Sequence, residues 1–136
     1  RKLNTGYRQT SKDFSTKRAV ELLLEKMIEH GIIKKPKRNF LRIVRNVVYF
    51  NAFLGKQSVY EDYVNSLLMP TIDLIKSDKE LYTKLMTEHT PNYRIPPKKF
   101  TEDTGLTHFP HVPFILERLI NLYIDINKDL KVGWVL

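Results

Sequence analysis

The stretch AVELLLEKMIEHGII, residues 19–33, decides how the chain folds. Its apolar residues recur three and four positions apart, so they share one face of an α-helix, while its glutamates form a stripe elsewhere. Gly31 follows as a residue that can adopt the left-handed conformation common after helices, with Ile32 as the hydrophobic partner of such a cap. The stretch therefore predicts a helix that begins after Ser15, ends beside Gly31 and buries one side.

The same helical period continues along the chain, and no segment alternates with a period of two for long enough to predict a strand. Because the apolar stripe keeps its phase across the proline at position 70, we expect one kinked helix there rather than two. The helices expected after the first lie at about 38–54, from Ser58 through Pro70, from Ser77 to about His89, and from Phe114 to Lys131.

Two of these helices open with the spacing of a capping box, in which a serine and a glutamate three positions later satisfy unpaired backbone N–H groups. The pairs are Ser58 with Glu61 and Ser77 with Glu80. They predict that each serine occupies the N-cap position of its helix.

Five of the seven prolines lie in residues 90–113. Proline removes a backbone donor, so we expect this segment to be a long ordered loop rather than a helix or a central strand. Pro113 then fits the first turn of the last helix, where a missing N–H costs nothing. That helix should bury Ile115, Leu119, Leu122, Tyr123, Ile126 and Leu130 and turn Glu117, Asn121, Asp125 and Lys128 to water.

These patterns predict an all-α fold, a single five-helix domain with a kinked third helix and a long proline-rich loop before the last helix. We expect the domain to cover residues 15–136, after a flexible basic arm over residues 1–14. A chain of 136 residues is long enough to bury a core, and its lack of cysteine excludes disulfides and thiolate metal sites. No apolar run approaches the ~18 residues that span a bilayer, so we expect an intracellular protein, cytoplasmic or nuclear.

Charge is distributed unevenly along the chain. Residues 1–45 hold 13 Lys and Arg against 4 Asp and Glu, whereas residues 46–136 hold 10 against 11. No acidic residue lies between Glu29 and Glu61. A local positive field of this kind attracts polyanions or acidic surfaces.

This charge gives the leading candidate site. In the helix expected at about 38–54 the arginines and a tyrosine fall on the side opposite the apolar face, where they can bind phosphates and stack on a base. The alternative is a solvated face that the glutamates of the first helix neutralise. The candidate residues are Lys34, Lys35, Lys37, Arg38, Arg42, Arg45 and Tyr49.

A second group interleaves aromatic rings and cations within the proline-rich segment. Tyr93 and Arg94, followed by Lys98, Lys99 and Phe100, would suit a single-stranded nucleic acid. The alternative is that these rings fill gaps in the core.

Three histidines of the proline-rich segment and its borders, with the acidic residues near them, are the candidates for a metal site or for acid–base catalysis. His89, His108 and His111 lie near Glu88, Glu102 and Asp103, but no spacing among them is diagnostic of either function. We therefore expect no metal and no cofactor.

The leading hypothesis is a non-enzymatic domain that binds DNA or RNA through its basic helix face and N-terminal arm. One alternative is a helical protein-interaction module that docks an acidic partner within a larger assembly. A further alternative is an enzyme with its site in residues 88–113. Binding to an anionic membrane is less favoured, because no face combines the cations with exposed bulky apolar residues.

Overall fold

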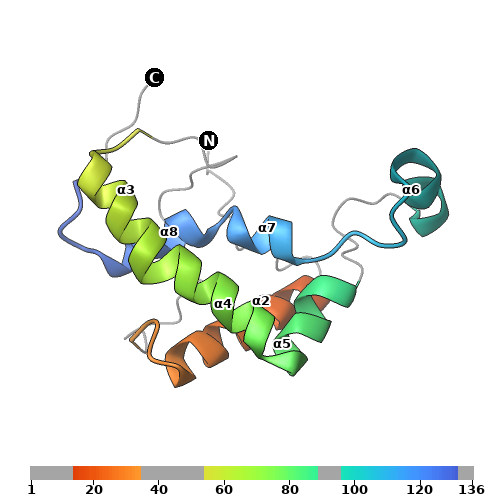
Figure 1. The fold of residues 1–136 in the computed structure, drawn as a ribbon, viewed down its shortest axis with the longest axis horizontal. Coiled ribbons are helices and arrows are strands. Elements are labelled where there is room, and N and C mark those ends of the chain that lie inside the picture. The colour runs from red at the N-terminus through yellow and green to blue at the C-terminus, as the bar shows by residue number, and fades with distance from the viewer. Residues whose placement is uncertain (1–13, 35–53, 89–95, 132–136) are drawn as a thin grey trace.

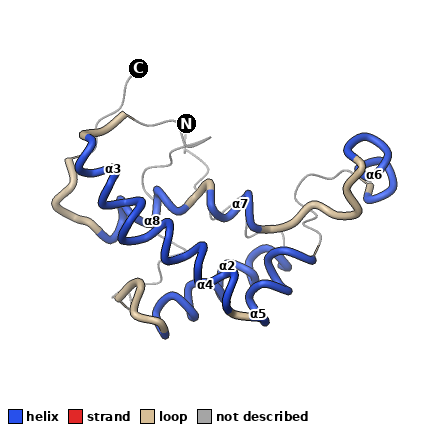
Figure 2. Tube along the Cα trace, in the orientation of Figure 1, coloured by secondary structure: helices blue, strands red, loops and turns tan. Residues whose placement is uncertain are grey.

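The computed structural model describes residues 14–34, 54–88 and 96–131, and every regular element within these ranges is a helix (Figure 1, Figure 2). The all-α prediction is confirmed for this part of the chain. Nearly all of the expected N-terminal arm and of the helix expected at about 38–54 lies outside it. The elements are α2 (Phe14–Glu29), α3 (Gln57–Tyr63), the π-helix η2 (Val64–Leu68), α4 (Met69–Ser77), α5 (Lys79–Tyr82), the π-helix η3 (Thr83–Thr87), α6 (Pro97–Thr104), α7 (Val112–Leu116) and α8 (Leu119–Ile126).

Helix α2 ends where its sequence predicts. Gly31 has a φ of 70°, in the left-handed region that favours glycine. Its N–H donates to Ile28 O at 3.0 Å, and the Ile32 N–H reaches back to Met27 O at 2.9 Å. These two bonds form a Schellman motif, which satisfies carbonyls that the end of the helix would leave unpaired.

Residues 57–77 form one continuous helical segment through Pro70, because the chain keeps right-handed helical angles from α3 through η2 into α4. The wider π turn ends at Leu68, and only Met69 separates it from the proline, which has no N–H for the helical ladder. The Met69 N–H accordingly donates to Val64 O, five positions back. Continuity through the proline is confirmed, whereas the kink stays a prediction.

The first predicted capping box is wrong. Helix α3 begins at Gln57, so Ser58 lies within its first turn and cannot occupy the N-cap position. Lys56 stands there in an extended conformation, and its side chain makes no capping bond. Glu61 instead accepts a hydrogen bond from Gln57 Nε2 at 2.6 Å, a pair spaced four positions apart on the helix surface.

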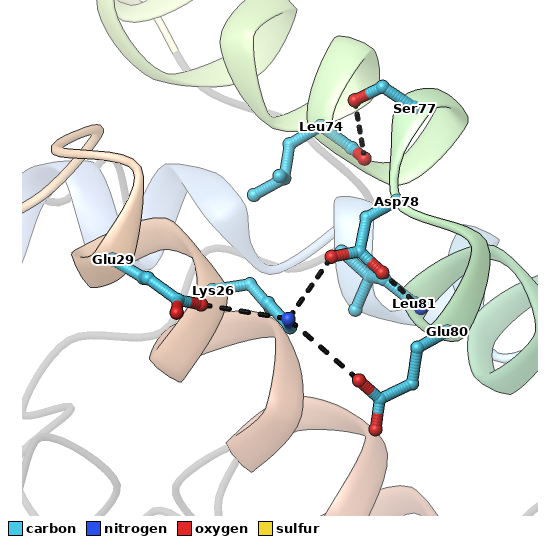
Figure 3. Close-up of polar contacts among 7 residues, drawn as sticks. All are labelled: Lys26, Glu29, Leu74, Ser77, Asp78, Glu80 and Leu81. Carbon is cyan, nitrogen blue, oxygen red and sulfur yellow. Dashed lines mark hydrogen bonds and ion pairs between the residues drawn. The ribbon is translucent and has the colours of Figure 1, made fainter.

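The second predicted capping box is displaced by one residue. The N-cap of α5 is Asp78, whose Oδ1 accepts a hydrogen bond from the Leu81 N–H at 2.9 Å (Figure 3). The hydroxyl of Ser77 donates to Leu74 O, in the last turn of α4. Because Asp78 has an extended backbone, with ψ at 112°, the chain turns sharply between α4 and α5.

Asp78 also joins this turn to α2. Lys26 Nζ lies 3.2 Å from Asp78 Oδ2, with Glu29 Oε2 at 3.6 Å and Glu80 Oε2 at 3.8 Å (Figure 3). The hydrogen bond from the Leu81 N–H, followed by those involving Lys26, lowers the pKa of Asp78. The hydrogen bond to Asp78 raises the pKa of Lys26 in turn. One carboxylate therefore caps a helix and ties two helices together.

The proline-rich segment contains a helix, so the expectation of a loop throughout is wrong. Helix α6 begins at Pro97, where the missing N–H leaves no helical bond unmade. It ends at Gly105, which has a φ of 74° and donates its N–H to Thr101 O at 2.8 Å. Figure 1 shows α6 at one end of the molecule, apart from the other labelled helices.

The last helix is broken, whereas the sequence predicts one helix from Phe114 to Lys131. A turn at Arg118 separates α7 from α8, and α8 ends before Lys131. The Arg118 N–H bonds Ile115 O, three positions back, and Phe114 O accepts from the Arg118 guanidinium at 2.8 Å. The guanidinium also lies 3.7 Å from the centroid of the Phe114 ring. The Arg118 side chain thus bonds the carbonyl of Phe114, which would accept the Arg118 N–H if the helix continued.

Helix α8 lies in the middle of the core. Residues 119–123 are all buried, which is more than one face of a helix, and the ring of Tyr123 meets that of Tyr63 edge to face. Asn121 was expected to face water but is 4% exposed, because the turn at Arg118 resets the helical phase. The main core cluster consists of Ala19, Leu23, Met27, Ile33, Tyr63, Leu67, Leu74, Ile75, Leu81, Leu85, Ile115, Leu119, Ile120, Leu122 and Tyr123.

Two substitutions of Asp78 distinguish its role as a helix cap from its role in the ion pair with Lys26. Asp78→Ala removes the cap and the ion pair and should lower the Tm by roughly 3–5 °C. Asp78→Asn should cost less, because asparagine caps about as well as aspartate and loses only the charge facing Lys26. Thermal unfolding followed by circular dichroism measures both.

The loss of stability in Asp78→Ala should also depend on pH. Because the folded protein lowers the pKa of Asp78, its stabilisation is present above the usual value of 3.8 and disappears as the pH falls through the lower folded value. Equal Tm values for Asp78→Ala and the parent chain at neutral pH would contradict this role.

Candidate functional site

The predicted nucleic-acid site falls almost entirely outside the described residues. Lys34 is described, and its side chain is exposed. The other candidates are Lys35, Lys37, Arg38, Arg42, Arg45, Tyr49, Tyr93 and Arg94, and all of them lie in ranges that the structure does not describe.

The end of α2 fixes where residues 34–45, the basic segment, leave the helical body. Ile33 is 5% exposed and belongs to the main core, and its N–H lies 3.3 Å from Met27 O. Lys34 follows directly and is exposed. A buried side chain and a capped helix end therefore hold the start of the basic segment at the protein surface.

The acidic stripe of α2 bears on whether this segment is neutralised. Glu29 is exposed and forms an ion pair with Lys26, three positions back in the same helix. Glu25 is exposed and Glu21 is half-buried. At least one of the three glutamates that could balance the basic segment is thus engaged within its own helix.

The described residues carry almost no net charge. They include 13 Lys and Arg against 14 Asp and Glu, whereas the remaining residues include 10 Lys and Arg and a single acidic residue, Asp13. The whole positive excess therefore belongs to residues 1–13, 35–53 and 89–95. The helical body is therefore nearly neutral, and the excess of Lys and Arg belongs to the other parts of the chain.

The second candidate group divides between surface and interior. Lys98 and Lys99 are exposed on α6, but Phe100 is 6% exposed and packs edge to face on Phe109, with ring centroids 5.4 Å apart. The Phe100 ring is therefore not available to stack on a base. The Phe100 ring therefore fits the alternative, in which the aromatic rings of this segment fill hydrophobic gaps.

The histidines of the proline-rich segment bind the end of η3. His108 Nε2 lies 2.6 Å from Met86 O, and its Nδ1 lies 3.1 Å from Thr107 Oγ1. His111 is fully buried, and its backbone N–H donates to Leu85 O at 2.9 Å. Both histidines therefore hold helix-terminal carbonyls, which have no partner within the helix.

The acidic residues of the same pool do not converge on these histidines. Within residues 14–34, 54–88 and 96–131, no three His, Cys, Asp or Glu side chains gather as metal ligands. Glu88 pairs with Lys84 at 2.6 Å, while Glu102 and Asp103 are exposed on α6. His89 lies outside the described residues.

A tyrosine–carboxylate contact joins α8 to α3, and no local sequence pattern predicts it. The Tyr123 hydroxyl donates to Asp62 Oδ2 at 2.5 Å across 61 positions of sequence. Burial, with Asp62 as a second cause, raises the pKa of Tyr123 to about 12, and burial raises that of Tyr63 to about 12. Both phenols therefore remain neutral donors at physiological pH, which suits a structural role.

Asp125 is half-buried, although its place on the predicted last helix puts it in water. Its Oδ2 is buried without a hydrogen-bond partner among the described residues. Burial raises the pKa of Asp125, against the opposing effect of Lys128. Burial in this position disfavours the charged form of the Asp125 carboxyl.

Comparisons of the chain with protein families, curated proteins and solved structures gave no match. None of the helices in the described ranges is long and apolar enough to cross a lipid bilayer.

Replacing Asp125 with asparagine should stabilise the protein at neutral pH. Because burial raises its folded pKa, ionised Asp125 destabilises the native state above the usual value of 3.8, and this effect grows until the folded pKa is passed. The difference in unfolding free energy between Asp125→Asn and the parent chain should accordingly shrink as the pH falls toward about 4, which is close to the usual aspartate pKa. Urea unfolding at several pH values measures it.

Asp129→Asn is the matched control, because Asp129 is an exposed aspartate in the turn after α8, four residues further along the chain. It should change stability little at any pH. A pH dependence as large as that of Asp125→Asn would show that burial of Asp125 is not the cause.

Proposed function

We propose that this protein is a non-enzymatic nucleic-acid-binding domain that contacts phosphates through its basic segment and its N-terminal residues 1–14. The separation of charge carries the proposal. The described body is nearly neutral. The residues outside it include ten Lys and Arg but a single acidic residue, Asp13. A positive field concentrated in this way draws polyanions to the segments that carry it.

The residue types suit phosphate contacts. Arg38, Arg42 and Arg45 recur on one side of the expected helix, and each guanidinium can hold a phosphate with two hydrogen bonds. Tyr49, further along the same side, offers a ring for stacking on an unpaired base. Tyr93 with Arg94 would add a second ring and cation. Such contacts fix position on the nucleic acid without reading its sequence, so we expect little sequence preference.

The anchoring of the segment supports the same proposal. Ile33 is buried in the core and Lys34 is exposed beside it, so the first cation is held at the surface by the fold itself. Since Glu29 is paired with Lys26, α2 has less negative charge to offer the basic segment than its sequence suggests.

Reversing Arg42 and Arg45 to glutamate should weaken binding to labelled single-stranded and duplex DNA and RNA. For two phosphate contacts on a duplex, the slope of log affinity against log salt should fall by about 1.8. Affinity at about 50 mM salt should drop roughly tenfold or more, with a smaller loss at about 200 mM. Fluorescence anisotropy measures both, and circular dichroism checks that the fold is kept.

Lys76→Glu with Lys79→Glu is the matched control, because it changes net charge equally at two exposed positions of the helical body. It should leave the salt slope unchanged. Equal losses in the two double variants would mean that net charge alone drives binding, and unchanged binding after reversal of the arginines would place the contact elsewhere. Binding of poly-glutamate without binding of nucleic acid would favour the acidic-partner alternative.

A further inference from the structure

Three thioethers decide the sulfur chemistry of this protein. The chain contains three methionines and no cysteine, and Met27, Met69 and Met86 all lie in the described ranges. Peroxides oxidise methionine to its sulfoxide, which replaces a flexible apolar side chain with a polar one. The place of each methionine in the fold therefore determines which of them reacts and what the reaction does to the structure.

Met27 is the most protected of the three. It is 0% exposed in the main core, and the Thr71 hydroxyl of α4 lies 3.9 Å from its sulfur. That hydroxyl also lies 2.6 Å from Leu67 O, to which it donates its single hydrogen. A sulfoxide oxygen at Met27 would be a strong acceptor buried in an apolar cluster, which costs free energy. Oxidation of Met27 therefore requires unfolding and opposes refolding.

Met69, in contrast, lies at the surface. It is 44% exposed at the first position of α4 and does not belong to the main core cluster. Its N–H donates to Val64 O, so the backbone keeps its helical bond. Asp73 and Lys76, four and seven positions further on, are exposed on the same side of the helix. Met86 is half-buried and packs against the main cluster. Peroxide thus reaches Met69 most readily, without any opening of the fold.

We propose that Met69 is a site of reversible oxidation to methionine sulfoxide in the folded protein, with hydrogen peroxide as the oxidant. A lone pair of the Met69 sulfur attacks one peroxide oxygen, the O–O bond breaks, and the departing hydroxide takes the proton of the transferred OH and leaves as water. The sulfur loses two electrons and the peroxide gains them. Reduction back to the thioether consumes two thiols of a methionine sulfoxide reductase, which form a disulfide while the oxygen leaves as water. Because Met69 lies on the exposed side of α4, the sulfoxide stays in water and the core keeps its packing.

Peptide mapping by mass spectrometry of the whole chain treated with hydrogen peroxide tests the assignment. The peptide that contains Met69 should gain one oxygen at least about a hundredfold faster than the peptide that contains Met27, because the unfolded fraction of an ordinary domain is smaller still. Met86 should also react more slowly than Met69. In urea below the unfolding transition, the oxidation rate of Met27 should rise with the unfolded fraction, whereas that of Met69 should stay nearly constant.

The oxidised chain and two variants complete the experiment. The chain oxidised at Met69 alone should unfold within about 2 °C of the parent Tm, and methionine sulfoxide reductase should restore the parent mass. Met69→Leu should lose the fast reaction, and Met86→Leu, the matched control, should keep it.

Three results on the parent chain would each overturn the proposal. The first is that the folded chain takes its first oxygen at Met27 or Met86. The second is that the oxidation of Met69 rises with urea as that of Met27 does. The third is that the chain oxidised at Met69 loses its helical circular-dichroism spectrum. Because these measurements need no substitution, they decide the matter even where a variant fails to fold.

Discussion

The turn at Asp78 is the constraint on which the described fold depends. Its carboxylate accepts the Leu81 N–H at the start of α5 and lies 3.2 Å from Lys26, in the last turn of α2. Negative charge at a helix N-terminus and positive charge at a helix C-terminus are both favoured by the helix dipoles. The turn brings α5 against α2, so that Leu81 and Leu85 join the same core as Met27.

Polar groups at helix ends account for the ways in which the structure departs from simple helical periodicity. The Arg118 guanidinium donates to Phe114 O at the end of α7. His108 contacts Met86 O from a segment 22 positions away. In these two cases a side chain supplies the donor that the next turn of helix would have supplied. At the end of α8, Tyr123 O accepts from both the N–H and the Nδ2 of Asn127. These contacts divide apolar stretches that periodicity alone would join.

Charge is divided between the part of the chain that the structure describes and the rest of the sequence. The described body is nearly neutral and has a common hydrophobic core, whereas the excess of Lys and Arg belongs to residues outside the described ranges. The described body and the basic segment adjoin at Ile33 and Lys34, where a buried residue directly precedes the first exposed cation of the segment. This arrangement suits the binding of a polyanion, because phosphate contacts need clustered charge at a fixed position more than they need a deep pocket.

The sequence by itself determined the helical class, the capped end of α2, the helical continuity through Pro70 and the location of the positive charge. Each of these follows from local periodicity, from glycine stereochemistry or from composition. Only the tertiary structure decided that Asp78 rather than Ser77 caps α5, that Phe100 is buried, that Asn121 lies in the core and that two histidines bind η3. These outcomes depend on donors and acceptors far apart in sequence, and no local pattern records which of several chemically equivalent partners the folded chain brings together.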